Sequence, residues 1–319
     1  MNRLSTSPPA QAQSASRSPM AALLQWFDTG AVSGDAGRHG IDWLRVVPFV
    51  LLHVACIGVI WVGVSPIALA VAIGLYALRM FALTGFYHRF FSHRAFRTSR
   101  AVQLVFAVIG ASCVQRGPLW WAAHHRQHHR HADTELDPHS PTVYGFLWSH
   151  MGWFLTPSAF RTDMSRVPDW QKYPELRWLD RFDTVVPVAL AVTLFGLGSL
   201  LHATVPSWGT TGAQMLVWGF FVSTVVLFHA TVTINSLAHR FGRRRFATRD
   251  DSRNNLWLAL ITFGEGWHNN HHFYPGAARQ GFRWWEVDLT WYGLRLLAAM
   301  GLVWDLKPVP AWVAQKAEY

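Results

Sequence analysis

The chain has 319 residues, of which 51% are hydrophobic and 14% are charged, a balance too apolar for an ordinary water-facing surface. Its 28 basic and 18 acidic residues give a formal net charge of +10, which suits either nucleic acid or the anionic headgroups of a membrane. Only two cysteines occur, Cys56 and Cys113, both in apolar runs, which argues against a disulfide framework and a thiolate metal site. The composition predicts an integral membrane protein.

Residues 1–40 are rich in Ser, Pro, Ala and Gln and show no hydrophobic periodicity. They contain no uninterrupted apolar segment before a cleavage site, so they are not typical of a signal peptide. This composition predicts a disordered N-terminal tail. We expect a membrane domain at residues 41–306 and a C-terminal tail at residues 307–319.

Four apolar stretches are long enough to cross a bilayer, which takes about 20 residues of helix. They cover approximately residues 46–64, 66–87, 184–205 and 214–234. A fifth apolar run, at residues 101–114, is shorter and ends in QRGP. Its length alone leaves its placement open.

Three histidine-rich sequences decide the number of spans. They are HRFFSH (88–93) after the second span, HHRQHH (124–129) after the fifth run and HNNHH (268–272) after the fourth span. If the fifth run crossed the membrane, the first two sequences would face opposite compartments and could not share a metal centre. We therefore expect that run to lie in the interface or against the bundle. The prediction is an all-α membrane protein with four transmembrane helices and a helical cap that holds a histidine-rich di-metal site.

The distribution of Lys and Arg agrees with this topology. The spacers between spans one and two and between spans three and four contain neither residue, whereas the other side carries Arg89, Arg94, Arg97, Arg100, Arg240, Arg243, Arg244 and Arg245. By the positive-inside rule, both termini and the histidines are cytoplasmic, at the inner membrane if the protein is bacterial. The net charge then reflects orientation and affinity for membrane lipids, and nucleic acid is not an expected partner.

Two sets of three histidines have the spacing i, i+3 and i+4, which places side chains on one face of a helix. We expect each set to aim its imidazoles at one place. The sets are His125, His128 and His129, and His268, His271 and His272.

The remaining candidates bring the number of imidazoles to nine. His88 and His93 are five residues apart, about 140° around an α-helix, so they are predicted to diverge toward two different ions. His239 lies four residues after Asn235 and is expected to face the same direction. Imidazole suits Zn, Cu, Fe and Ni, and nine are too many for one ion, so two redox-active ions with about four histidines each are predicted. A metal transporter is disfavoured because its ligands would lie near the membrane midplane.

The other eight histidines are not predicted to bind metal. His39 lies in the tail, and three more lie in spans and are read as hydrogen-bonded core residues: His53, His202 and His229. Outer or surface roles are expected for four near the second set: His124, His131, His139 and His150.

From about Arg79 to Asp305, the chain resembles the membrane fatty acyl desaturases, specifically the stearoyl-CoA desaturase-like Δ9 group and its bacterial members. The sequences that carry this resemblance stand in family order and at family-like separations. They are GFYHRFFSHRAF, HHRQHHRHADTELDPH, SHMGW, NSLAHRFG and NNLWLALITFGEGWHNNHHFYP.

In that family, nine histidines bind two irons, an asparagine reaches one iron through water, and the centre uses O₂ to remove hydrogens from two adjacent methylenes. The resemblance implies a cis double bond, at Δ9, in a saturated acyl chain. Regioselectivity must come from geometry, because the methylenes offer no group for a side-chain acid or base. The implied ligands are His88, His93, His125, His128, His129, His239, His268, His271 and His272, with Asn235 linked through water.

Three polar residues beside the histidine sets are expected to orient imidazole N–H groups: Glu265, Asn270 and Asp137. Glu265 fits a structural role at a helix end equally well. The sequence assigns no substrate-binding residue.

The acyl carrier stays open between CoA and phospholipid. Animal acyl-CoA members of the family have an Arg–Asp pair directly before the second histidine set, where this chain has Ala123 and His124. No haem-binding extension follows Asp305, so a separate electron donor is expected: a ferredoxin, a cytochrome b5-like protein or a flavin reductase system. The alternative function is a hydroxylase of the same di-iron superfamily, acting on a lipid or alkyl substrate.

Overall fold

A computed structural model describes residues 23–31 and 40–316 of the chain. Among these residues, four helices are long and apolar enough to cross a membrane: Trp43–Val62, Pro66–Ser92, Val185–Thr204 and Gly212–Ser236. Each overlaps one predicted span, so the prediction of a four-span helical membrane protein is confirmed. The second helix runs further than expected and carries the first histidine of the site.

The four spans are built from consecutive helical segments. Side-chain caps begin three of them, at Asp42, Ser65 and Thr211. The Ser65 hydroxyl, directly before Pro66, accepts from the Ala68 amide. The segments are α2 (Trp43–Ala55), η2 (Cys56–Gly58) and α3 (Val59–Val62); α4 (Pro66–Phe81) and η3 (Ala82–Ser92); α10 (Val185–Thr204); and α11 (Gly212–Gln214), η8 (Met215–Val222) and α12 (Ser223–Ser236).

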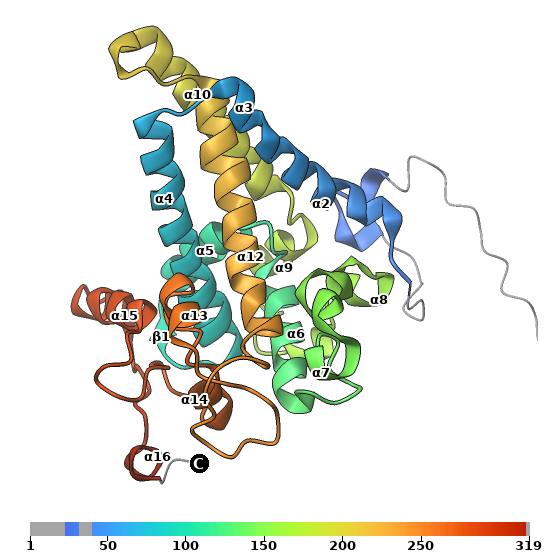
Figure 1. The fold of residues 1–319 in the computed structure, drawn as a ribbon, viewed down its shortest axis with the longest axis vertical. Helices are drawn as coiled ribbons and strands as arrows, with labels where there is room; N and C mark the ends of the chain where they lie inside the picture. The colour runs from blue at the N-terminus through green and yellow to red at the C-terminus, as the bar shows by residue number, and fades with distance from the viewer. Residues whose placement is uncertain (1–22, 32–39, 317–319) are drawn as a thin grey trace, which may run out of the picture.

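Shorter elements form a cap at one end of the spans, opposite the turns that join α3 to α4 and α10 to α11 (Figure 1). The helical ones are η1 (Thr29–Ala31), α5 (Arg100–Ala111), α6 (Pro118–His131), α7 (Pro141–Tyr144), η4 (Trp148–Gly152), η5 (Trp153–Leu155), α8 (Pro157–Phe160), η6 (Met164–Arg166), α9 (Pro174–Arg181), α13 (Leu256–Ile261), α14 (His268–Phe273), α15 (Leu289–Ala299) and α16 (Ala311–Gln315). A further turn, η7 (Pro206–Trp208), follows α10 at the far end. One antiparallel pair, β1 (Arg97–Thr98) and β2 (Val303–Trp304), ties the segment after η3 to the C-terminal part.

The short apolar run forms α5, a 12-residue helix that is not among the candidate spans. It packs against η3, where the Tyr87 hydroxyl donates to the carbonyl of Ala107 at 3.1 Å. Gly110 permits the close approach, because a Cβ there would lie 2.1 Å from the Tyr87 ring. The expectation that this run lies against the bundle agrees with the structure.

The two tails differ in part from the sequence expectation. Most of the N-terminal tail, residues 1–22 and 32–39, lies outside the described residues. Residues 23–31, however, are a folded segment: the Trp26 indole donates to the Leu44 carbonyl, and Asp28 pairs with Arg181 at 2.8 Å. In the C-terminal tail, Lys307 bonds to the Ala95 carbonyl and α16 follows, so this segment packs onto the domain.

Candidate metal centre

The nine predicted histidines converge in the cap as two adjacent groups. In each group, one nitrogen of every imidazole lies within 4.8 Å of the others. The five-histidine cluster contains His88, His93, His125, His129 and His271, and the four-histidine cluster contains His128, His239, His268 and His272. The geometry matches the expectation of two sites with about four imidazoles each.

The first pair of histidines does not diverge. His88 and His93 both belong to the five-histidine cluster, with ring centroids 4.9 Å apart. The divergence prediction assumed an α-helix, but η3 is π-helical, and its i to i+5 hydrogen bonds, such as the one from the His93 amide to the His88 carbonyl, bring residues five apart into line. The prediction that these two side chains serve different ions is therefore wrong.

Neither set of three histidines aims at one place. On α6, His125 and His129 enter the five-histidine cluster while His128 enters the other. On an α-helix, positions i+3 and i+4 differ by about 100° around the axis, which is enough to separate two sites.

On α14 the division is reversed, because His268 and His272 join the four-histidine cluster while His271 joins the other. The two helices thus each supply both clusters. The prediction that each set serves one place is wrong for the same geometric reason.

Three carboxylates hold the outer nitrogens of the four-histidine cluster. The Nδ1 atoms of its rings lie 2.9 Å from Asp137 for His128, 2.7 Å from Asp133 for His239 and 3.0 Å from Asp250 for His272. Each carboxylate accepts an N–H from the ring that it touches, which fixes the proton on Nδ1 and the lone pair on Nε2. The rings are therefore oriented with their acceptor nitrogens inward.

This orientation leaves inward lone pairs facing one another. The Nε2 atoms of His128 and His272 lie 3.3 Å apart, and both are acceptors once Nδ1 carries the proton. Two neutral acceptors at this distance repel unless a cation lies between them. The four-histidine cluster therefore fits a metal ion, and the donor set, all imidazole, is one that Zn, Cu, Fe and Ni accept.

Burial keeps most of the imidazoles neutral, as metal binding requires. It lowers the pKa of His129 and His268 well below the ordinary value, and neighbouring histidines lower it further. Burial also lowers the pKa of His272 to about 4, against the opposing effect of the hydrogen bond that His272 donates to Asp250. His128 is different: burial lowers its pKa, but the ionised Asp137, Asp133 and Asp250 together outweigh burial and leave the pKa raised.

The five-histidine cluster has a different outer environment. Glu265 pairs with Nδ1 of His88 and also accepts from Arg89 at 3.0 Å. Arg89 is buried and donates to Asp288 as well. Gln280 donates to Glu265 at 3.0 Å and lies 3.2 Å from Nδ1 of His88. One carboxylate, shared with a guanidinium, thus serves this cluster.

The predicted outer residues fall into two groups. Asp137 and Glu265 contact imidazoles in the expected manner. The Asn270 amide instead bonds to Asn254, Arg245, Glu286 and the Gln280 carbonyl, so its described bonds brace the loops around α14.

Sequence reasoning missed Asp133, Asp250 and Gln280 as partners of the histidines. Asp133 had a local signal, because it lies in HADTELDPH near Asp137. Asp250 and Gln280 had none, since the histidines that they contact lie 22 and 192 residues away in the sequence.

Several other histidines lie near the centre. His139 packs beside His128 in a tilted arrangement, with ring centroids 4.5 Å apart and its Nδ1 3.6 Å from Asp137. His53, His229 and His150 form a hydrogen-bonded chain with nitrogen separations of 3.0 Å. These contacts agree with hydrogen-bonded or outer roles and show a chain that the sequence did not indicate.

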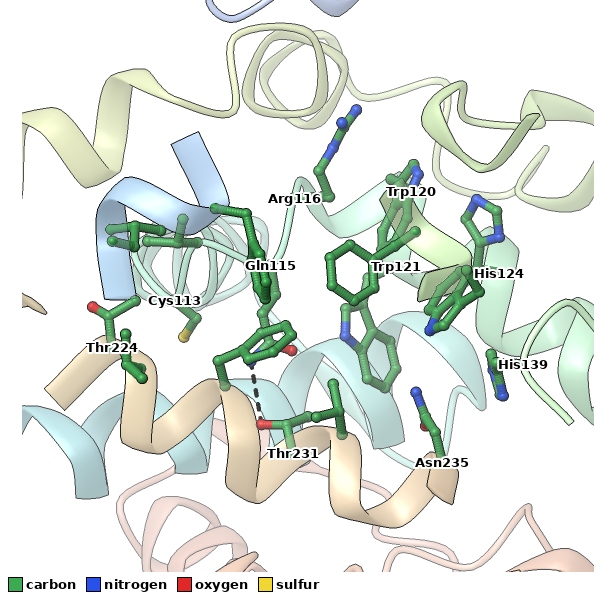
Figure 2. Close-up of a pocket in the computed structure, with 18 of the residues that line it drawn as sticks. Cys113, Gln115, Arg116, Trp120, Trp121, His124, His139, Thr224, Thr231 and Asn235 are labelled. Carbon is green, nitrogen blue, oxygen red and sulfur yellow. Dashed lines mark hydrogen bonds between the residues drawn. The ribbon is translucent and has the colours of Figure 1, made fainter. Parts of the chain in front are cut away.

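A cavity lies beside the centre, and both apolar and polar side chains line it. Thr224, Thr231 and Asn235 lie along α12 on one side of it, and Gln115 crosses to Thr231 with a 3.2 Å hydrogen bond (Figure 2). His125 of the five-histidine cluster is part of its wall.

The two ends of the cavity differ in polarity. The part between the spans is mainly apolar, with Phe49, Leu52, Val225 and Phe228, and also contains His53 and Thr224. The end inside the cap is lined instead by aromatic and polar side chains, namely Arg116, Trp120, His124, His139 and Trp153. A long apolar chain with a polar head group would fit this arrangement.

Comparison with known proteins agrees with the geometry. The chain matches the fatty acid desaturase family over residues 42–306. It is 36% identical to an sn-2 palmitoyl-lipid 9-desaturase of Nostoc sp., over 86% of this chain and 93% of the relative. It is 36% identical to an sn-1 stearoyl-lipid 9-desaturase of Anabaena variabilis, over 84% of this chain and 94% of the relative. It is 37% identical to an acyl-CoA 5-desaturase of Anemone leveillei, over 83% of this chain and 79% of the relative. The chain therefore belongs to the fatty acid desaturase family, whose members are oxidoreductases acting on acyl chains.

Proposed function

We propose that the two histidine clusters each hold one iron and that this centre, with O₂, introduces a cis double bond at Δ9 into a saturated acyl chain. The observation that carries the proposal is the inward convergence of imidazole acceptors whose outer nitrogens are fixed by carboxylates. When bound, reduced iron supplies O₂-dependent removal of hydrogen from unactivated C–H bonds, which no side chain of the cavity can perform. Zinc is disfavoured because it has no redox chemistry.

The protein's own contribution is to place two methylenes beside the centre and to exclude water. Trp121 stacks on the ligand ring of His125, with centroids 5.0 Å apart, and both line the cavity. Asn235 lines the same region, which suits a residue that reaches one iron through water. Because these walls confine the acyl chain, the depth to which it enters the cavity selects the carbon pair that lies beside the metal centre.

We propose a membrane glycerolipid as the acyl carrier. Two relatives covered over more than nine tenths of their length are named acyl-lipid 9-desaturases. The chain also has Ala123 and His124 where animal acyl-CoA members have an Arg–Asp pair. The arginines of the cap would face the anionic leaflet.

The same charge distribution supports an orientation with the centre and both termini in the cytoplasm, at the inner membrane of a bacterium. Electrons would then come from a separate cytoplasmic donor protein, a ferredoxin, a cytochrome b5-like protein or a flavin reductase system. Two electrons, two protons and one O₂ balance the removal of two hydrogens as two waters.

The test is expression in aerobic cells that lack Δ9 monounsaturated chains. Lipids are separated by class, and gas chromatography with mass spectrometry locates the double bonds. New cis-Δ9 chains in glycerolipids, with labelled acyl-CoA left unchanged in isolated membranes, support the proposal. Hydroxylated chains would establish the hydroxylase alternative, and conversion of acyl-CoA ahead of glycerolipid would contradict the carrier.

A further inference from the structure

Trp153 carries an indole N–H that has no hydrogen-bond partner among the described residues. The side chain is 7% exposed, and its Nε1 atom is buried. Trp153 begins η5 directly after the π-helical η4 and lines the cavity beside the metal centre. A buried indole N–H normally finds an acceptor, so this one calls for an explanation.

Neighbouring tryptophans satisfy the same requirement within the protein. The Trp120 indole donates to the Ala159 carbonyl at 2.7 Å, and the Trp148 indole donates to the Pro138 carbonyl at 3.0 Å. Both belong to the aromatic cluster that includes Trp153. Trp153 therefore differs from the two neighbouring tryptophans, and the adjacent rings of His124 and His139 also carry buried nitrogens without a described partner.

The position of Trp153 along the cavity indicates which molecule supplies the acceptor. Its ring lies 4.9 Å from His139, which in turn lies 4.5 Å from the ligand ring of His128. It also lies 5.5 Å from His124. Trp153, His139 and His124 line the part of the cavity inside the cap, whereas the part between the spans is mainly apolar.

A saturated acyl chain that occupies this cavity has its methyl end in the apolar part and its carboxyl derivative in the polar part. Along the whole chain, the carbonyl oxygen is the acceptor nearest to the methylenes that react. An N–H that only donates, as an indole does, matches that oxygen. The carbonyl of an ester and that of a thioester are equivalent in this respect.

We propose that Trp153 is a positioning residue whose indole N–H donates a hydrogen bond to the acyl carbonyl. The bond fixes the number of methylenes between the carbonyl and the metal centre, so the enzyme counts the double-bond position from the carboxyl end. This inference rests on the proposed desaturase function. It adds the contact that sets the register of the substrate.

The test compares Trp153→Phe with the wild-type enzyme in isolated membranes supplied with the native electron-transfer system. The substitution keeps the aromatic ring and removes the N–H. We expect KM to rise about 2- to 10-fold, the usual worth of one hydrogen bond. The products should also spread over neighbouring double-bond positions. A loss of folded enzyme alone would lower the yield without moving the double bond.

Trp148→Phe is the matched control, because its N–H binds the Pro138 carbonyl in the same aromatic cluster and Trp148 is not part of the cavity wall. It should keep the wild-type product position. If both variants give one unchanged position and unchanged KM, the positioning role of Trp153 is overturned.

A substrate pair tests the same contact without any substitution. Wild-type enzyme is given a palmitoyl ester and the corresponding hexadecyl ether on the same phospholipid, and palmitoyl-CoA with its hexadecyl thioether in parallel. The forms without a carbonyl should show the higher KM and the spread of positions, and Trp153→Phe should not distinguish the two forms. Equal regioselectivity for both forms would overturn the inference, whereas no monounsaturated product from any wild-type reaction would instead contradict the proposed function.

Discussion

The two histidine clusters use the same ligand type but are held in place differently. Three carboxylates fix the outer nitrogens of the four-histidine cluster, namely Asp133, Asp137 and Asp250. The five-histidine cluster has one carboxylate, Glu265, which is shared with Arg89. The first site is oriented mainly by charged acceptors, and the second by the π-helical turn of η3 and the packing of the rings. Outer carboxylates orient ligands and raise their basicity, so the two metals should respond differently to the same kind of substitution.

The largest effect is expected from removing a ligand of the four-histidine cluster. His128→Ala leaves three imidazoles in the cluster, so we expect loss of one of two irons and no detectable desaturation. Iron analysis of purified protein and gas chromatography of lipids would measure both. His131→Ala, on the same helix but in neither cluster, should behave as wild type; an active, iron-replete His128→Ala enzyme would disprove the ligand assignment.

Removing a carboxylate that orients a ligand should have the next largest effect. Asp137→Asn keeps the size of the side chain but removes the charge that favours the His128 N–H tautomer. We expect iron affinity of the four-histidine site to fall about 10- to 100-fold, with the other iron retained. Chelator titration followed by iron analysis separates the two ions, and Asp163→Asn, at an exposed position paired with Arg166, is the control. Equal loss of both irons would refute independent support of the two sites.

Glu265→Gln should have a smaller effect, on the five-histidine cluster alone. The amide still offers an oxygen to His88, and Gln280 also lies beside the same nitrogen, so we expect about a 10-fold loss of affinity, the low end of the range for such partners. The same titration gives the order in which the irons leave. If Glu265→Gln releases iron more readily than Asp137→Asn, the contrast between the clusters is wrong.

The smallest effect concerns the pH dependence of the metal-free protein. Burial lowers the pKa of His124 and of His139 to about 3, whereas an unfolded histidine titrates near 6.5. The unfolded state therefore binds more protons between these values, and the free energy of unfolding should fall as pH drops below 6.5. Thermal melting in detergent should show the midpoint decreasing by a few degrees from pH 7 to pH 5. A midpoint that rises over this range would contradict the burial of these rings in neutral form.

Much of the architecture was predictable because it depends on composition and spacing. Apolar length alone indicated the spans, and the need for one shared compartment correctly excluded the run that became α5. The π-helical turn that brings His88 and His93 together was not predictable from a periodicity based on the α-helix. Each histidine set is divided between two clusters because successive residues of an α-helix point about 100° apart. This angle separates the side chains only because two clusters lie side by side.

The supporting residues show the same limit. Asp137 could be found because it lies nine residues after the histidine that it contacts, whereas Asp250 and Gln280 contact histidines 22 and 192 residues away. The described segment at residues 23–31 was also missed, because its contacts with Leu44 and Arg181 are tertiary. Local sequence thus indicated the clustered histidines better than it indicated the residues that support them.

The central claim is that each cluster holds one iron, and anomalous scattering measured on either side of the iron absorption edge tests it most directly. Diffraction from crystals of the aerobically expressed protein should give two peaks per chain that disappear below the edge. One peak should lie among His88, His93, His125, His129 and His271, and the other among His128, His239, His268 and His272. A single peak, or peaks that persist below the iron edge and follow the zinc edge instead, would contradict the account.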